Sequence, residues 1–370
     1  MEDRPGDTFN EIHDQARCCE RTISMSGARL GCLRPLLPLD QYTDIVITGC
    51  GSSYHLASCA SFAWAQMLSR PVQAVQASQL MSFSERYFPA AARPLVIAIT
   101  RSGGTSEVEQ AVLRLRDRYG AVALAVTGEP GGTVAGVCDA EIAFTECSEK
   151  SIVTTRAFTS MLLGLYLLAD DLSGSRYRAD LEVIPMLIES AMESSELVAR
   201  RMAEDWRISR FVFLGSGAMK GLADECALKM TEMALSVASS WLTLEFRHGP
   251  KAALDSSTQV VVFPVECERP YLSKVFEEIT ETGASILILG GQSRVKPGRA
   301  GSVDSSALSP RIRDYGRLTV EVEFGNSISE VLRPALYVHV GQLMGYWRAM
   351  AGRLNPDSPP YLTRTVLLER

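Results

Sequence analysis

Short runs of consecutive apolar residues alternate along this chain with longer segments of helical pattern. In the first half, the apolar runs fall at 44–48, 95–99 and 121–126, and helical patterns occupy 106–118 and 157–170. A strand that is apolar at every position must be covered on both faces, and a parallel sheet flanked by helices provides that cover. The alternation therefore predicts an α/β fold built on parallel sheets.

The same pattern starts again after about residue 180. Gly49 closes the first apolar run, and Gly215 closes a corresponding run at 211–215. The next strand ends 50 residues after the first glycine, at Ile99, and 48 residues after the second, at Phe263. These matching intervals predict two copies of one α/β unit.

The length of 370 residues fits two such units at roughly 150 residues per domain. A polar segment at 171–180 is the best candidate for the connection between them, and a stretch with glycine, serine and proline at 291–309 is expected to be a loop. We expect four parts: an N-terminal helical segment (1–30), a first unit (31–178), a second unit (179–350) and a C-terminal tail (351–370).

Composition excludes several classes of protein. The net charge of −6 leaves no basic footprint for nucleic acid. The longest apolar run, at 161–169, is less than half of a membrane span, and the N-terminus has no apolar signal core. The nine cysteines show no CxxC pair, so reduced core thiols such as Cys59 and Cys226 are expected. We expect a cytoplasmic protein that binds neither nucleic acid nor membrane.

Three loops rich in hydroxyl groups follow strands of the first unit. The carboxyl ends of parallel strands meet at one edge of the sheet, where α/β folds bind ligands. Hydroxyl and N–H groups at helix N-termini bind phosphate, although serine and threonine also serve as simple helix caps. Three clusters on one edge favour a phosphate site. The clusters are Ser52 and Ser53, then Thr100, Ser102 and Thr105 around Gly103, then Thr154 and Thr155.

The glycines of these loops do not match a nucleotide-binding fingerprint. Neither Gly49-Cys-Gly51 nor Gly215-Ser-Gly217 is followed by the third glycine of the dinucleotide motif, and no Walker lysine follows either loop. A nicotinamide cofactor or a P-loop is therefore not indicated.

A second candidate group lies in the second unit. Glu225, Lys229 and Glu232 are spaced i, i+4, i+7, so they share one face of a helix. A surface stripe of ion pairs has the same spacing. Sixteen residues beyond Glu232, His248 stands in a Gly-Pro turn, which favours a functional role.

Two other histidines have simpler interpretations. His339 lies on an apolar helix and is expected to be packed in the core. His55 opens a helix and is expected to be a structural hydrogen-bonding group.

Together these segments resemble the sugar isomerase (SIS) domain family, and more closely the double-SIS isomerase part of the glutamine:fructose-6-phosphate aminotransferases. The resemblance covers nearly the whole chain, in the same order. The segments that carry it are Gly49-Cys-Gly-Ser-Ser-Tyr-His55, Thr100-Arg-Ser-Gly-Gly-Thr105, Val153-Thr-Thr-Arg-Ala-Phe158, Glu225-Cys-Ala-Leu-Lys-Met-Thr-Glu232, Arg247-His-Gly-Pro250 and Asp357-Ser-Pro-Pro-Tyr-Leu-Thr-Arg-Thr-Val366.

The resemblance implies two tandem flavodoxin-like SIS units, each a parallel sheet flanked by helices, and it implies roles for individual residues. Glu232 would move the proton between C1 and C2 of the sugar, with Lys229 as a supporting catalytic residue. His248 would open the sugar ring in the neighbouring subunit of a homodimer with shared active sites. The implied substrate- and phosphate-binding residues are Cys50, Gly51, Ser52, Ser53, Thr100, Arg101, Ser102, Gly103, Thr105, Ile152, Thr154, Glu225 and Arg364.

Three departures from the aminotransferases matter. Position 2 is Glu2 instead of the nucleophilic cysteine, and the first unit begins near Asp44, so no glutaminase domain is expected before it. Arg364 replaces the Schiff-base lysine, and a guanidinium does not form an imine. Arg101 replaces a glutamine and adds a cation beside the expected phosphate.

The resemblance and these departures predict a glutamine-independent enzyme that converts glucosamine 6-phosphate to fructose 6-phosphate and ammonia. Ring opening followed by proton transfer between adjacent carbons needs no metal, nicotinamide or pyridoxal. Two alternatives remain open. One is a deglycase that splits a 6-phosphofructosyl-amine into glucose 6-phosphate and an amine. The other is a non-catalytic SIS sugar-phosphate sensor, against which the pair Glu232 and His248 argues.

Overall fold

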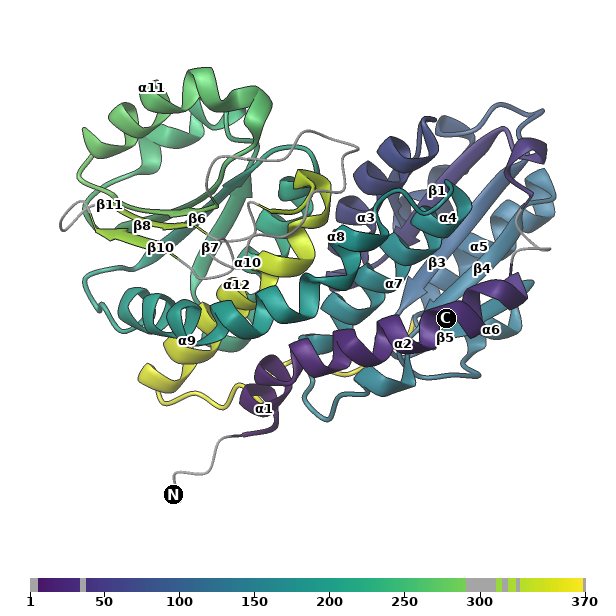
Figure 1. Ribbon diagram of the computed structural model, residues 1–370, viewed down its shortest axis with the longest axis horizontal. Coiled ribbons are helices and arrows are strands. Elements are labelled where there is room, and N and C mark those ends of the chain that lie inside the picture. Colours follow the sequence, from purple (N-terminus) through teal and green to yellow (C-terminus); the bar gives the residue numbers. More distant parts are fainter. Residues whose placement is uncertain (1–5, 34–37, 291–310, 315–318, 324–326, 369–370) are drawn as a thin grey trace.

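Each half of the chain forms one sheet with helices on both of its faces (Figure 1). The computed structural model describes residues 6–33, 38–290, 311–314, 319–323 and 327–368. The loop expected at 291–309 lies outside the described residues. The predicted fold class, two parallel sheets flanked by helices, is confirmed.

The first sheet has the order β2-β1-β3-β4-β5, and all of its strands are parallel. This is the flavodoxin-like order, in which the direction of winding reverses between β1 and β3. The strands are β1 (Asp44–Gly49), β2 (Gln73–Gln76), β3 (Pro94–Thr100), β4 (Val122–Thr127) and β5 (Ala140–Ala143).

Two apolar clusters cover the two faces of this sheet. On one face, Ile47 and Ile97 pack with helices α3 and α7, and on the other, Val46 and Val96 pack with α4 and α5. β3 is buried at every position, as its continuous apolar run predicted. The helices of this half are α3 (Ser52–Leu68), α4 (Ala77–Phe83), α5 (Ser106–Tyr119), α6 (Thr133–Gly136) and α7 (Arg156–Leu172).

The second sheet has the order β10-β11-β9-β8-β6-β7, with β10 antiparallel and the other strands parallel. Its elements are β6 (Arg210–Gly215), α10 (Ala218–Ala234), β7 (Val237–Trp241), β8 (Thr258–Phe263), α11 (Arg269–Thr280), β9 (Ser285–Leu289), β10 (Arg311–Asp314), β11 (Thr319–Glu323) and α12 (Pro334–Ala351).

The second sheet repeats part of the strand order of the first, which agrees with the matching spacing of the glycines. β7, β6, β8 and β9 repeat the order of the first four strands of the other sheet. Gly51 (φ 54°, ψ −128°) and Gly217 (φ 59°, ψ −133°) stand at equivalent positions before α3 and α10 with the same backbone conformation. Such positive φ values are strained for residues with a Cβ atom.

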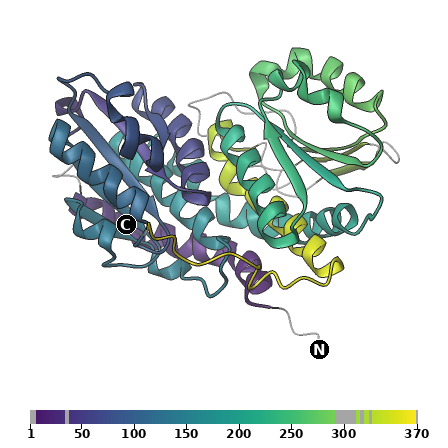
Figure 2. The same cartoon turned by 180° about the vertical axis from the view of Figure 1, so that it is seen from behind.

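Helices α3 and α10 pack against each other and join the halves. A side chain at Gly221 of α10 would lie 2.6 Å from the carbonyl oxygen of His55 and 2.7 Å from Cys59 Sγ, so the two backbones approach closely. Figures 1 and 2 show α2 alongside the first half and α9 and α12 toward the second sheet, and α1 packs beside α12 through Phe9 and Tyr346. The remaining helices are α1 (Asp7–His13), α2 (Gln15–Leu33), α8 (Arg178–Glu182) and α9 (Ile184–Ala203).

The cysteines and helices bear on two sequence expectations. Cys59 and Cys226 are buried free thiols, as predicted. Over the described residues, every helix is too short or too polar to cross a membrane.

His339 is packed in the core, as predicted from its apolar helix. It has no exposed surface, and its Nε2 lies 2.9 Å from Ser195 Oγ. Burial lowers the pKa of His339 to about 4. In the unfolded chain, the imidazole of His339 takes up a proton near pH 6.5, whereas in the folded chain it stays neutral down to about pH 4. The folded state therefore keeps its full stability from this group above about pH 6.5, and it loses that stability progressively as the pH falls toward 4.

We predict that His339→Gln weakens this dependence while keeping a hydrogen-bonding group beside Ser195. Between pH 7.5 and pH 5, the wild type should lose about 2 kcal/mol more unfolding free energy than the variant. Urea unfolding at both pH values measures the difference. An equal loss in the two proteins would contradict the buried, neutral histidine.

Candidate active site

The hydroxyl-rich loops of the first half lie side by side at the carboxyl edge of its sheet. One loop (50–51) leads from β1 into α3, whose first residues are Ser52 and Ser53. The other loop (101–105) leads from the end of β3, at Thr100, into α5. β1 and β3 are neighbours in the sheet. The loops therefore flank the point where the winding reverses, which is the usual ligand site of open α/β sheets.

The loop after β3 is fixed by short internal contacts. Thr100 Oγ1 and Thr105 Oγ1 lie 2.9 Å apart, and the N–H of Gly104 donates to Ser102 Oγ at 3.4 Å. The carbonyl of Gly103 (φ 75°) accepts the N–H of Val134 at 3.0 Å. The loop is thus held against the segment that follows β4, and Ser102 and Thr105 remain partly exposed.

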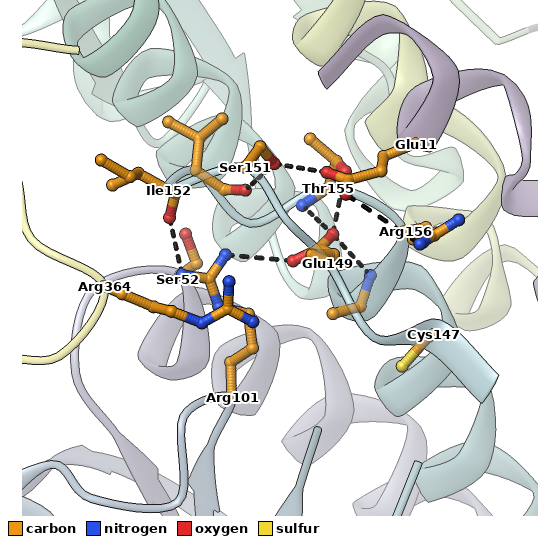
Figure 3. Close-up of polar contacts among 12 residues, drawn as sticks. Glu11, Ser52, Arg101, Cys147, Glu149, Ser151, Ile152, Thr155, Arg156 and Arg364 are labelled. Carbon is orange, nitrogen blue, oxygen red and sulfur yellow. Dashed lines mark hydrogen bonds and ion pairs between the residues drawn. The ribbon is translucent and has the colours of Figure 1, made fainter. Parts of the chain in front are cut away.

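Arg101, in the loop after β3, forms an ion pair with Glu149, which precedes α7. Its Nη1 is 3.0 Å from Glu149 Oε2, and its Nη2 donates to the carbonyl of Ile152 at 2.6 Å (Figure 3). The guanidinium is almost completely buried. Its direct contact with phosphate stays a prediction, whereas its contact with the loop before α7 is a feature that the sequence did not indicate.

Glu149 organises the start of α7. Its Oε1 accepts the N–H of Thr155 at 2.7 Å, the Thr155 hydroxyl at 2.8 Å and the N–H of Ala157 at 3.0 Å. Its other oxygen holds Arg101. The pair therefore fixes the loop that carries Ile152 and Thr154 against the loop after β3.

Lys229 is the centre of the second candidate group. Its ammonium is fully buried and lies 2.5 Å from Glu232 Oε2 and 3.3 Å from Glu225 Oε1. It also donates to Ser52 Oγ at 3.2 Å. The shared helix face is confirmed, and its interpretation as a solvent-exposed stripe is wrong, because the face is buried against α3. Ser52 links this group to the first hydroxyl loop.

Glu225 is buried with two cationic or hydrogen-bonding neighbours. His55 Nδ1 lies 3.0 Å from its Oε2, which confirms His55 as a hydrogen-bonding group. Burial opposes ionisation, but Lys229 and His55 hold the pKa of Glu225 below its ordinary value. Burial likewise disfavours the charged lysine, but Glu225 and Glu232 raise the pKa of Lys229. At neutral pH this buried lysine is therefore an ammonium ion beside a carboxylate.

Glu232 and His248 differ from the buried pair in accessibility. The Glu232 side chain is 20% exposed, so it can contact a bound molecule. His248 is exposed in the turn after the 3-10 helix Glu245–Arg247. Among the described residues, the polar contacts of Glu232 do not include His248.

Arg364 comes to this region from the C-terminal tail. Its Nε donates to Glu129 Oε1 at 2.9 Å, and its Nη2 contacts the same oxygen. Figure 3 shows the side chain pointing toward Arg101 and Ser52. Figure 2 shows the tail running from the end of α12 past α1 to the first sheet.

The remaining loop residues have structural contacts. Cys50 is partly buried, and burial raises the pKa of its thiol to about 12, so the thiol is neutral. Its carbonyl accepts the N–H of Ser53 at 3.1 Å, and that of Gly51 accepts the N–H of Tyr54 at 2.9 Å. Where the structure describes side chains, no cluster of three or more histidine, cysteine or acidic residues could hold a metal ion.

Comparison with known proteins finds similarity over part and over nearly all of the chain. Residues 39–170, which include the first sheet and its hydroxyl loops, match the family model described as "SIS domain". The match ends before the second sheet, so a second SIS unit stays a prediction.

A curated relative and two solved structures extend the similarity. The glutamine–fructose-6-phosphate aminotransferase of Nostoc sp. is 29% identical over 390 residues, covering 98% of this chain and 59% of the relative. The chain thus spans about three fifths of that relative. Glucosamine-6-phosphate deaminase from Thermotoga maritima is 26% identical, with a TM-score of 0.72 and coverage of 98% and 100%. The C-terminal domain of glucosamine-fructose-6-phosphate aminotransferase from Francisella tularensis has a TM-score of 0.79, 19% identity and coverage of 96% and 99%.

We predict that Arg101→Met lowers the unfolding free energy by about 3 kcal/mol or more, because Glu149 would remain buried without its cation. The matched control is Arg116→Met, which removes an exposed ion pair with Asp139. That change should cost less than about 1 kcal/mol. Urea unfolding measures both variants, and equally small losses would contradict the structural importance of the Arg101–Glu149 pair.

Proposed function

We propose that this chain is a sugar-phosphate isomerase that converts glucosamine 6-phosphate to fructose 6-phosphate and ammonia. The observation that carries the proposal is the buried contact of Lys229 with Glu232 and Ser52. Through Lys229, the carboxylate of Glu232, which is suited to proton transfer, is linked to Ser52 at the start of α3, where phosphate can bind. The similarity to a glucosamine-6-phosphate deaminase over the full length of that chain supports the substrate class.

In the proposed reaction, the hydroxyl loops at the β1/β3 edge bind the 6-phosphate. His248 opens the pyranose ring by moving a proton between the ring oxygen and O1. The Glu232 carboxylate then removes the proton from C2 and returns it to C1 through an enolamine. The product of this transfer is a ketose imine at C2. Water hydrolyses the imine, which releases ammonia and leaves the C2 ketone of fructose 6-phosphate.

Lys229 and Arg364 have different parts in this scheme. The Lys229 ammonium holds Glu232 and Ser52 in one arrangement, so the base is fixed relative to the phosphate loop. Arg364 keeps its proton and forms no imine, so the only imine is that of the substrate nitrogen. Cys50, Gly51, Ser53, Gly103, Thr154 and Glu225 complete the proposed site.

We assign four parts to the chain on this basis. Residues 1–30 form a helical segment, 31–178 the phosphate-binding unit and 179–350 the unit with the carboxylates. Residues 351–370 form a tail that closes over the site, which is supported by the ion pair of Arg364 with Glu129.

The first experiment assays purified protein against glucosamine 6-phosphate, 6-phosphofructosyl-amines and unphosphorylated glucosamine. We predict ammonia and fructose 6-phosphate from the first compound.

In Glu232→Gln, turnover should fall by at least about two orders of magnitude while sugar-phosphate binding persists, because only the proton-transfer group is lost. Coupled assays of both products and calorimetric binding provide the measurements.

Each outcome of this panel is informative. Glucose 6-phosphate and free amine from the fructosyl-amine would identify a deglycase instead. Binding without turnover of any compound would identify a sensor. Near wild-type turnover in Glu232→Gln would remove Glu232 as the base.

A homodimer with shared sites is part of the proposal. His248 is exposed, and it follows β7, which lies at the edge of the sheet beside β6 in the described part of the chain. Val237, Trp241 and Leu242 expose apolar surface on this segment. An exposed apolar edge strand favours association with another chain. A second copy seated there would receive His248 in its own site.

We predict that inactive Glu232→Gln and His248→Ala protomers complement each other. Random exchange makes about half of the dimers mixed, and each mixed dimer has one site with both wild-type groups. Recovered activity of the unsorted mixture should approach about one quarter of the wild-type value. The mixed dimer, isolated after co-expression with two affinity tags, should reach about one half, because one of its two sites has both wild-type groups. No recovery in a verified mixed dimer would place both residues in the site of one protomer.

A further inference from the structure

The first helix of the chain receives its N-terminal cap from the other end of the sequence. α1 begins after Gly6, which has no side chain to cap it. The carboxylate of Asp357 accepts the N–H of Asp7 at 3.1 Å and the N–H of Thr8 at 2.7 Å. The Thr8 hydroxyl donates to the carbonyl of Pro356 at 3.1 Å. These contacts fasten the start of the tail to α1.

Beyond this point, the tail follows the loops of the candidate site. Arg364 reaches Glu129, and Thr365 Cγ2 lies 3.5 Å from the Cβ position of Gly104. The N–H of Leu368 donates to Ser106 Oγ at 3.2 Å. The tail therefore crosses the loop after β3 and reaches the start of α5 at Leu368.

The same helix also holds the loop that precedes α7. The carboxylate of Glu11 accepts the N–H of Lys150 at 2.5 Å and also binds the hydroxyl of Ser151 (Figure 3). The N–H of Ile152 donates to the carbonyl of Asp357 at 3.3 Å. α1, the tail and this loop thus form one hydrogen-bonded unit.

We propose that Asp357 is a positioning residue of the active site. Its carboxylate caps α1 and its backbone carbonyl accepts the N–H of Ile152, so it sets the tail that brings Arg364 to Glu129, next to the loop of Arg101. This inference rests on the proposed function, with Arg364 as the substrate-binding residue that the family resemblance implies. Asp357 itself does not touch the substrate in this arrangement.

The prediction follows from the fraction of molecules in which the tail is docked. Arg364 can bind substrate only when the tail is docked, so the apparent affinity for substrate falls as the docked fraction falls. Hydrogen bonds to a charged acceptor are stronger than neutral ones, and Asp357 accepts two from backbone N–H groups. Removing the carboxylate should therefore release the tail while the catalytic carboxylates stay in place.

We predict that Asp357→Ala raises KM for the phosphorylated substrate by about tenfold and changes kcat by less than about threefold. Asp357→Asn keeps one acceptor oxygen and should give a smaller increase. Gly6→Ala leaves Asp357 intact, but its methyl group would overlap the carboxylate, so it should act in the same direction. The matched control is Asp139→Asn, whose carboxylate accepts the N–H of Ala123 at 2.8 Å near the amino end of β4.

The rate of proteolysis within the tail reports its docking without an activity assay. Trypsin cleavage after Arg364, measured by mass as loss of residues 365–370, should be about tenfold faster in Asp357→Ala and Gly6→Ala than in the wild type. Asp139→Asn should match the wild type. Unchanged cleavage and unchanged KM in both tail variants would overturn the proposal.

A double variant separates positioning from general damage. If Asp357 acts through Arg364, adding Asp357→Ala to Arg364→Ala should raise KM by less than twofold beyond Arg364→Ala alone. A full tenfold further increase would show that Asp357 acts elsewhere. If the wild type turns over none of the sugar phosphates, the proposed function fails, and the trypsin measurement still decides whether Asp357 holds the tail.

Discussion

The structure of the candidate site depends on one buried ammonium ion. Lys229 has no contact with solvent, and a charge in such a place is stable only when it is paired and hydrogen-bonded. Glu225 and Glu232 supply the pairing from the same helix, and Ser52 supplies a hydroxyl from the other half of the chain. Moving the two halves apart would take the Ser52 hydroxyl from Lys229 and the His55 ring from Glu225, and would open this buried cluster. The ion therefore ties the arrangement of the halves to the geometry of the site.

The close approach of α3 and α10 makes this arrangement possible, and it also distinguishes the two repeated units. Gly221 allows the helices to meet. The first unit presents its loop hydroxyls at the junction, and the second presents carboxylates from its helix. The equivalent loop of the second unit, Gly215 to Gly217, has one hydroxyl, and Ser216 Oγ accepts the N–H of Thr243 at 3.3 Å. Although the two halves share a strand order, they contribute different groups to a single candidate site: hydroxyls from the first half and carboxylates from the second.

Local pattern in the sequence was sufficient for the parts whose physical cause is local. β3 and β8 were predicted because every residue is buried, whereas the edge strand β7 was missed because its side chains are half-exposed or exposed and break the apolar run. The common face of Glu225, Lys229 and Glu232 follows from helical spacing, but its burial depends on α3. The contacts Arg101–Glu149 and Thr8–Asp357 join residues 48 and 349 positions apart, and no local pattern encodes them.

Charge pairing also changes how the arginines of this region act toward an anion. Arg101 is neutralised by Glu149, and Arg364 is neutralised by Glu129. A phosphate that took the Arg101 guanidinium would leave Glu149 buried without its partner, which opposes the exchange. The Arg364–Glu129 pair is partly exposed, so Arg364 can turn to a substrate at little cost. Hydroxyl and N–H groups at the starts of α3 and α5 carry no burial penalty either. Phosphate recognition at this edge would then depend mainly on the hydroxyl loops, with Arg101 fixing the segments that surround them.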